Sequence, residues 1–150
     1  MDHSLTTELS TSAQMWGALW GDRPDAWAVS EEQQTPVYEQ ALRCIGLQAG
    51  MRVLDVGCGT GVFLRMCADR GATVSGLDAA PGLLELAQAR VPEAELRLDD
   101  LQVLPYEDDS FDVVTGFTSF FFADDMVAAL REAARVARRG APVVIRGSRT

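Results

Sequence analysis

The segment from Val53 to Gly61 combines residue types and a spacing that could do chemistry. It reads Val-Leu-Asp-Val-Gly-Cys-Gly-Thr-Gly, so glycines at alternate positions follow a short apolar run. Glycine allows a tight turn and lets a ligand approach the backbone closely. A plain chain reversal usually needs one glycine only. The segment therefore favours a ligand-binding loop over a turn that serves only to reverse the chain.

Two acidic residues accompany this loop. Asp55 lies two residues before Gly57, and Asp78 follows Gly57 by 21 residues, at the end of the next apolar run. A carboxylate at the floor of a site repels phosphate and attracts an amine, so Asp55 favours a cationic ligand. From the position of Asp78 a carboxylate can accept both hydroxyls of a ribose. Two structural roles stay open, a hydrogen bond from the loop amides to Asp55 and a helix cap at Asp78.

The composition excludes several kinds of chemistry. The chain of 150 residues carries 22 acidic and 13 basic side chains, a net charge of −9, and every basic residue is arginine. Phosphate-binding, Schiff-base and general-base lysines are therefore ruled out. His3 is the only histidine, and the spacing of Cys44, Cys58 and Cys67 matches no zinc pattern, so we predict no metal site. An acidic chain without an arginine–aromatic cluster is also a poor partner for nucleic acid.

The sequence predicts a cytoplasmic protein that does not enter membranes. Residues 1–10 lack the basic start and apolar run of a signal peptide. No run of about 18 consecutive apolar residues is present. The odd number of cysteines is typical of reduced thiols in the cytosol.

The elements that must position these residues begin with an N-terminal helical segment. A short amphipathic helix is predicted from the spacing of Leu9, Ala13, Trp16 and Trp20. A loop with Pro24 and Trp27 should follow, and then a helix from an N-cap at Thr35 to Ile45, ended by Gly46. We interpret residues 1–34 as a lid segment and residues 35–150 as the core domain.

From residue 52 onward, predicted strands alternate with predicted helices. The strands are expected at 52–56, 73–77, 94–98, 111–117 and 142–146. The helices are expected at 62–70, from Pro81, and from an N-cap at Asp124 or Asp125 to Gly140. This alternation predicts an α/β fold, a doubly wound and mostly parallel sheet with helices on both faces. Ligands of such sheets bind at the carboxyl ends of the strands, here after residues 56, 77, 98 and 117.

Three motifs in order resemble those of the class I S-adenosylmethionine-dependent methyltransferases of the small-molecule type. The motifs are Val53 to Gly61, Gly76-Leu-Asp78, and Asp100 to Pro105 followed by Ser110 to Val114. The resemblance covers roughly residues 35 to 146. It implies a Rossmann-like sheet with strand order 3-2-1-4-5 and S-adenosylmethionine as cofactor, with S-adenosylhomocysteine as its product. The implied activity is in-line methyl transfer to a small-molecule acceptor.

The resemblance also implies a role for individual residues. The loop of Gly57, Cys58, Gly59 and Gly61 would run along the methionine portion of the cofactor, with Cys58 present for its size. Asp55 would reach the amino group of that portion. Asp78 would hold the ribose, and Ala79 beside it would also contact the cofactor. Asp100 and the backbone NH of Leu101 would bind the adenine. Phe117 would flank the sulfonium, although plain core packing is an equal alternative, and Tyr38 would contact the cofactor from the segment that precedes the loop.

Two other functions compete with this interpretation. A nicotinamide-dependent oxidoreductase shares the strand–glycine–helix device, but Val62 stands where its fingerprint has a glycine, and Asp55 and the lack of lysine also argue against it. A cofactor-binding subunit or truncated domain without catalysis is the second alternative. No lysine or pocket histidine is available as a base, so an acidic acceptor such as a phenol, enol or carbon acid is favoured.

The end of the chain carries one more expectation. The family's sheet has two further strands after the one that matches Pro142 to Arg146, and the sequence ends at Thr150. A fifth strand left at the edge would expose unpaired backbone groups. The sequence therefore predicts a shortened member of the family in which this edge is buried, either in a homodimer with a second copy of the chain or by another polypeptide.

Overall fold

Five parallel strands form the sheet that carries the glycine loop. The computed structural model describes residues 13–15, 17–18, 23–117, 119–120 and 123–146. The strands are β1 (Arg52–Val56), β2 (Thr73–Asp78), β3 (Glu95–Leu98), β4 (Val113–Phe117) and β5 (Val143–Arg146). They pair in the order β3-β2-β1-β4-β5, and every pair is parallel. The predicted fold class and strand order are thus confirmed.

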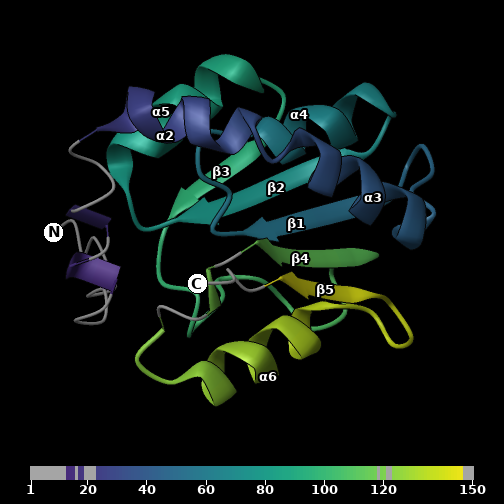
Figure 1. Ribbon diagram of the computed structural model, residues 1–150. Helices are drawn as coiled ribbons and strands as arrows, with labels where there is room; N and C mark the ends of the chain where they lie inside the picture. Colours follow the sequence, from purple (N-terminus) through teal and green to yellow (C-terminus); the bar gives the residue numbers. More distant parts are fainter. Residues whose placement is uncertain (1–12, 16, 19–22, 118, 121–122, 147–150) are drawn as a thin grey trace, which may run out of the picture.

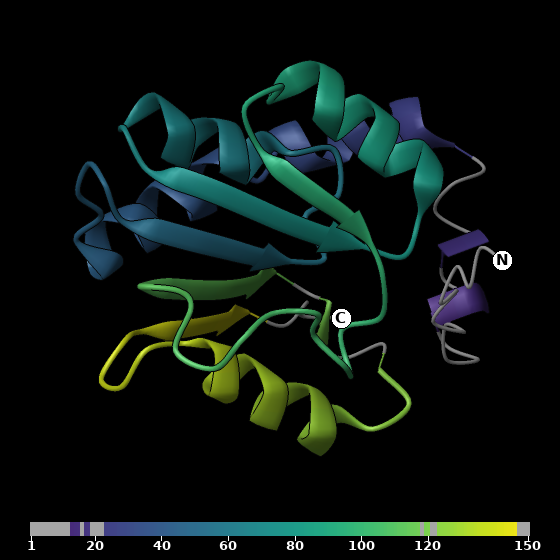
Figure 2. The same ribbon diagram turned by 180° about the vertical axis from the view of Figure 1, so that it is seen from behind.

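Helices cover both faces of the sheet, as Figures 1 and 2 show. One face is covered by α4 (Val62–Asp69) and α5 (Pro81–Arg90), against which α2 (Pro24–Glu32) packs, while α3 (Thr35–Ile45) packs against α4. The opposite face is covered by α6 (Met126–Val136). Each layer has its own apolar core, with Phe63 and Leu64 on the first side and Leu54 and Phe120 on the second.

The central strands are buried on both faces, and this fixes where their polar residues lie. In β1 and β4, Val53, Leu54, Val113 and Val114 are fully buried. Continuous apolar runs of this kind are typical of parallel strands that helices cover on both sides. Because such strands all end at the same edge of the sheet, the residues at their carboxyl ends come together there.

The loop predicted around Pro24 and Trp27 is wrong, since these residues belong to α2. A proline in the first turn and Asp25 beside it are ordinary helix-start signals. This helix lies on the outside of α4 and α5, and none of its residues is fully buried. It therefore has no apolar stripe that the sequence could reveal. Thr35 is the first residue of α3 rather than its N-cap, which is Gln34.

Other boundaries shift by a few residues. The fourth strand begins at Val113, because Phe111 forms only an isolated bridge with Ala137. That bridge needs an extended residue 137, so α6 ends at Val136 and not at Gly140. The third strand, expected at 94–98, comprises Glu95–Leu98. Residues 13–15 and 17–18 are helical, whereas Leu9, Trp16 and Trp20 of the predicted first helix lie outside the described residues.

At the edge of the sheet, β5 pairs with β4. Within the described ranges no strand pairs with its outer side, and Val143 is partly exposed there. The predicted dimer through this edge stays a prediction. In the part of the chain that the structure describes, no helix is both long and apolar enough to cross a bilayer.

The N-cap of α6 provides a test of this layer. The Asp125 carboxylate accepts the Ala128 amide at 3.0 Å, which decides between the two predicted capping residues. We expect Asp125→Ala to lower the free energy of unfolding by about 1 kcal/mol, because an orphan helix amide loses its acceptor. Asp125→Asn keeps an acceptor and should lose little. Urea unfolding followed by circular dichroism measures both, and equal stability of the two variants would contradict the assignment.

Candidate functional site

Asp55 lies at the carboxyl end of β1, where the neighbouring strand holds its side chain. It is 3% exposed, and its Oδ1 accepts the hydroxyl of Thr115 on β4 at 2.8 Å. The strand register explains the contact, because Asp55 and Thr115 are direct partners in the β1–β4 pair. The alternative of a bond from the loop amides to Asp55 is therefore wrong. The partner on β4 had no signal in the sequence, since it is 60 residues away.

Asp78 ends β2 and connects this strand to the glycine loop. Its Oδ2 accepts the Gly59 amide at 2.9 Å, and its Oδ1 accepts the Ala80 amide at 3.0 Å. The alternative role as helix cap is wrong, because Ala80 is the N-cap of α5 and has no side-chain cap bond. The side chain is only 5% exposed. These amides orient the carboxylate and leave lone pairs for further donors.

The amides of the glycine loop are all used inside the protein. Each residue from 57 to 62 donates its backbone NH to an acceptor of the chain: Gly57 and Cys58 to the Leu77 carbonyl, Gly59 to Asp78, Thr60 and Val62 to Glu31, and Gly61 to the Cys58 carbonyl. A phosphate-binding loop directs such amides at its ligand. This loop surrounds itself with oxygen acceptors, so it suits a ligand that donates hydrogen bonds or carries positive charge.

The glycines at 57 and 59 are needed because the chain's own residues approach them. Both have positive φ, +79° and +56°. A Cβ at Gly57 would overlap Ser119, whose hydroxyl donates to the Val56 carbonyl at 2.6 Å. A Cβ at Gly59 would lie 2.7 Å from Oε2 of Glu31. The loop is thus closed from one side by the segment after β4 and from the other by α2.

Glu31 is a site residue that the sequence did not reveal. Its Oε2 accepts the Thr60 amide at 2.8 Å and the Thr60 hydroxyl at 2.7 Å, and its Oε1 accepts the Val62 amide at 3.2 Å. The side chain comes from the last turn of α2, in a run of polar residues that is typical of a solvated surface. Only the packing of α2 on α4 brings it to the loop.

Arg90 of α5 binds the same part of the glycine loop, at Thr60. Its guanidinium donates to the hydroxyl of Thr60 at 2.9 Å and to the Thr60 carbonyl at 3.3 Å. The same group pairs with Glu32 at 3.1 Å. Thr60 is therefore held by a carboxylate on one side and a guanidinium on the other, and α2 is bound to both the loop and α5.

Buried negative charge dominates the electrostatics of the site. Burial raises the pKa of Asp55 well above its usual range, and the charges of Glu31 and Asp78 raise it further. Burial also raises the pKa of Asp78 and of Glu31. Among the residues that the structure describes, neither Asp55 nor Asp78 has an arginine within ion-pair distance. A buried carboxylate without a cation is costly, so a cationic ligand fits this set of acceptors.

Three aromatic rings lie beside these carboxylates. Phe117, at the end of β4, has its ring centroid 4.8 Å from those of Tyr38 and Phe63. Burial raises the pKa of the Tyr38 hydroxyl, and the charges of Glu31 and Asp55 add to this effect. Tyr38 is buried, and Phe117 is half-buried. The two predicted aromatic residues are thus brought together, and Phe117 also takes part in the core packing that was its alternative role.

Two smaller residues of the predicted site also have defined surroundings. Cys58 is buried, and this burial raises the pKa of its thiol well above the usual range, which agrees with a packing role. Ala79 lies at the end of β2, and a Cβ at the buried Gly17 would overlap its carbonyl. The N-terminal helical residues therefore rest directly on the strand end that carries Asp78.

The segment after β3 contains the remaining predicted residues. Asp100 is 7% exposed and accepts the Gln102 amide at 3.0 Å, while Leu101 is half-buried. The Asp99 amide donates to the Asp78 carbonyl at 3.1 Å. This bond places the start of the segment next to Asp78, so the structure brings the second and third motifs together.

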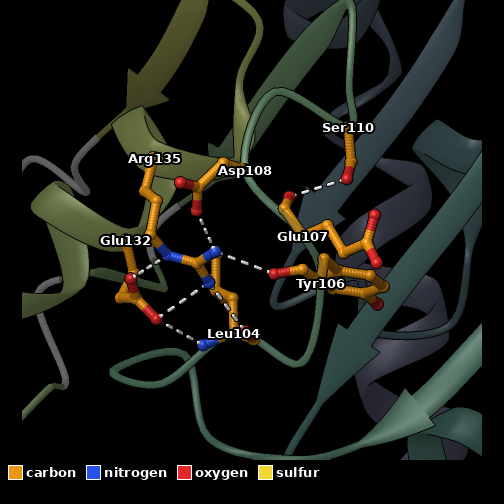
Figure 3. A network of polar contacts seen from close by, with 7 residues as sticks. All are labelled: Leu104, Tyr106, Glu107, Asp108, Ser110, Glu132 and Arg135. Atoms are coloured by element: carbon orange, nitrogen blue, oxygen red, sulfur yellow. Dashed lines mark hydrogen bonds and ion pairs between the residues drawn. The ribbon is translucent and has the colours of Figure 1, made fainter.

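An arginine on α6 binds the rest of the segment after β3, residues 104–108 (Figure 3). The guanidinium of Arg135 donates to the carbonyls of Leu104 and Tyr106 at 2.9 and 2.8 Å, and it pairs with Asp108 and Glu132. Glu132 in turn accepts the Leu104 amide at 3.0 Å. The bond from Arg135 lowers the pKa of Glu132. Residues 104–108 therefore follow the surface of α6 closely.

Comparison with known proteins decides the family. The profile described as "Methyltransferase domain" matches residues 54–145. The chain belongs to this methyltransferase family. The chain is 36% identical over 140 residues to an uncharacterized protein of Mycobacterium tuberculosis, covering 91% of this chain and 51% of that protein. It is 36% identical to the malonyl-acyl-carrier-protein O-methyltransferase of Serratia marcescens, over 74% of this chain and 44% of that enzyme.

Solved structures agree with this assignment. An S-adenosylmethionine-dependent methyltransferase from Aquifex aeolicus has 26% identity and a TM-score of 0.65, with 72% of this chain and 62% of that one covered. Phosphoethanolamine N-methyltransferase 1 of Haemonchus contortus shares the fold with a TM-score of 0.79 at 20% identity, over 91% of this chain and 32% of that one. The predicted cofactor, S-adenosylmethionine, is confirmed for the family. The methyltransferase domain described here spans about half the length of the curated relatives it matches.

The contacts of Arg135 in this methyltransferase domain can be tested directly. Arg135→Met removes every donor while keeping an unbranched chain, and we expect the free energy of unfolding to fall by about 1–3 kcal/mol because charge-assisted bonds to half-exposed groups are lost. The Leu104 amide should also exchange its hydrogen faster. Arg131→Met, on an exposed site of the same helix, is the matched control. Hydrogen exchange and urea unfolding give the answer, and identical behaviour of the two variants would refute the role of Arg135.

Proposed function

We propose that this domain binds S-adenosylmethionine and directs its methyl group to a small-molecule acceptor. The observation that carries the proposal is the pair of buried carboxylates, Asp55 and Asp78, which meet at the glycine loop without an arginine partner in the described residues. A ligand with an ammonium group, a sulfonium and ribose hydroxyls supplies positive charge and donors where the protein offers acceptors.

The roles of the residues follow from their positions. Asp55 would attract the amino group, directly or through water, while Thr115 holds the carboxylate in place. Asp78, oriented by the amides of Gly59 and Ala80, would accept the ribose hydroxyls. Asp100 and the Leu101 amide would hold the adenine. Tyr38 and Phe117 would offer aromatic faces to the positive sulfur.

For methyl transfer, the protein mainly has to position the two reactants and exclude water from the site. The cofactor, when bound, supplies a methyl group activated by positive sulfur. The residues of the strand ends would fix the orientation of the reacting groups in line, which accounts for much of the rate in such displacements. We propose that the N-terminal segment, residues 1–34, acts as the lid that keeps water out, because Gly17 and Glu31 of its described part reach Ala79 and the glycine loop.

The acceptor is best sought among acidic oxygen compounds. The chain has no lysine, and its single histidine is His3, so a strong base for an unactivated hydroxyl or amine is not at hand. A phenol, enol or carboxylic acid needs no such base. Two relatives are named as methyltransferases of oxygen. One is the malonyl-acyl-carrier-protein O-methyltransferase of Serratia marcescens, and the other is the 27-O-demethylrifamycin SV methyltransferase of Amycolatopsis mediterranei, which is 33% identical over 85% of this chain and 52% of that enzyme.

Cofactor binding is the direct test of the proposal. Titration calorimetry with S-adenosylhomocysteine should show binding, and Asp78→Ala should weaken it by about 1.5–3 kcal/mol because a charged acceptor loses two hydroxyl donors. Glu85→Ala, an exposed carboxylate on α5, is the control and should bind as the wild type does. A preference for a nicotinamide dinucleotide, or unchanged affinity in Asp78→Ala, would sink the assignment.

Asp55 offers a second test, because its charge should favour cofactor binding but lower the stability of the folded protein. Its folded pKa lies above the unfolded value, so the folded state holds the proton longer, and stability declines as pH rises from the unfolded pKa through the folded pKa. Asp55→Asn should therefore raise the free energy of unfolding at pH 8 by on the order of 1 kcal/mol and flatten this decline.

The same substitution should weaken the binding of S-adenosylhomocysteine roughly tenfold, because the amino group loses a charged partner. Thermal unfolding across pH and titration calorimetry measure the two effects. A purely structural Asp55 would show lower stability and unchanged affinity. Thr115→Val, which removes only the hydroxyl that orients Asp55, should fall between the wild type and Asp55→Asn in affinity.

A further inference from the structure

We propose that Glu31 is a specificity-determining residue of the cofactor site. Its carboxylate fills the anion position at the start of α4 and so keeps phosphate-bearing ligands away from the glycine loop. The inference rests on the proposed function, because it concerns which ligands the same site accepts. It goes further in naming a residue from the N-terminal segment that decides between a phosphate-free nucleoside and a dinucleotide.

The first argument is the place that the carboxylate occupies. The first amides of a helix have no partner in the helix itself, and together with the helix dipole they attract anions. The helix α4 has eight residues and begins at Val62, whose amide points to Oε1 of Glu31 at 3.2 Å. The amide of Thr60, just before the N-cap Gly61, points to Oε2 of the same carboxylate at 2.8 Å. A strand, a glycine loop and a helix N-terminus together form the usual phosphate-binding device of α/β folds. Here a side chain of the protein holds the position of the phosphate.

The second argument is that the loop has no other donor to offer. The remaining amides of residues 57 to 61 donate to the carbonyls of Leu77 and Cys58 and to Asp78. An incoming phosphate would therefore have to displace Glu31 or meet its negative charge. Gly59 is shaped for this arrangement, since a Cβ there would collide with the Glu31 carboxylate.

The third argument is what would remain if the carboxylate were removed. The Thr60 and Val62 amides would lose their acceptor, and the hydroxyl of Thr60 would be released from it as well. Arg90 would stay beside Thr60, with its guanidinium 2.9 Å from the hydroxyl oxygen. A loop amide, the first amide of a helix, a hydroxyl and a guanidinium are donors of the kinds that bind phosphate in proteins. A single side chain thus separates this site from a phosphate site.

A simple tie between α2 and the loop would not require a charged group. A neutral acceptor can receive an amide bond without the cost of burying a carboxylate, and here burial raises the pKa of Glu31. The use of a carboxylate is explained by a second task, which is to repel anions. The specificity role has one measurable consequence, namely that loss of Glu31 creates affinity for phosphate.

Inorganic pyrophosphate is the probe, followed through the amide resonances of Thr60 and Val62 in nitrogen–proton correlation spectra. In Glu31→Ala these resonances should shift on titration, with an affinity for pyrophosphate about tenfold or more above that of the wild type. Glu31→Ser is the second variant, in case the alanine variant does not fold. Asp25→Asn is the matched control, because it removes an exposed carboxylate of α2 and leaves both amides bound and the pair of Arg90 with Glu32 intact.

S-adenosylhomocysteine is titrated in parallel, so that the two proposals can fail separately. Absence of binding to the wild type would reject the proposed function, whereas the pyrophosphate experiment alone judges Glu31. If the folded Glu31→Ala or Glu31→Ser protein shows no gain over the wild type, or if Asp25→Asn gains as much, the specificity role is overturned. A gain confined to the Glu31 variants supports it.

Discussion

The site depends on one electrostatic constraint, the burial of carboxylates around a loop whose amides are already bonded. Asp55 and Asp78 accept from Thr115 and from loop amides, but these donors are neutral and do not cancel the charge. A parallel sheet covered on both faces excludes the water that would otherwise solvate them. The ligand-free domain therefore carries an electrostatic cost at its functional end, and a cationic ligand relieves that cost when it binds.

The strand order brings the two carboxylates together. In the sheet β1 lies between β2 and β4, so Asp55 pairs with Gly76, two residues before Asp78, on one side and with Thr115 on the other. Each strand end then contributes one chemical property: charge from β1 and β2, and an aromatic face from Phe117 of β4. Residues that are far apart in sequence form one site because parallel strands end on the same side.

These strand ends are also the part of the site that could be predicted from the sequence. Apolar runs and glycines located the strands, and the carboxylate that follows each run was visible in the sequence. Glu31 could not be found in this way, because it lies in a polar run of a helix without an apolar stripe, and a docked surface helix gives no periodic signal. Thr115 and Arg90 were missed for the same physical reason: their partners are fixed by strand register and helix packing at long sequence separation.

The same strand–loop–helix device can serve ligands of opposite charge, and the difference lies in what completes it. Where the helix amides are open, the device binds phosphate. In this chain a carboxylate from a preceding helix completes it, and the acceptors of Asp55 and Asp78 face the same space. The spacing of the glycines alone therefore does not show whether such a loop binds phosphate or a cationic ligand, because the same loop conformation serves both. The deciding residues stand outside the motif, and one of them, Glu31, comes from a helix that precedes the first strand of the sheet.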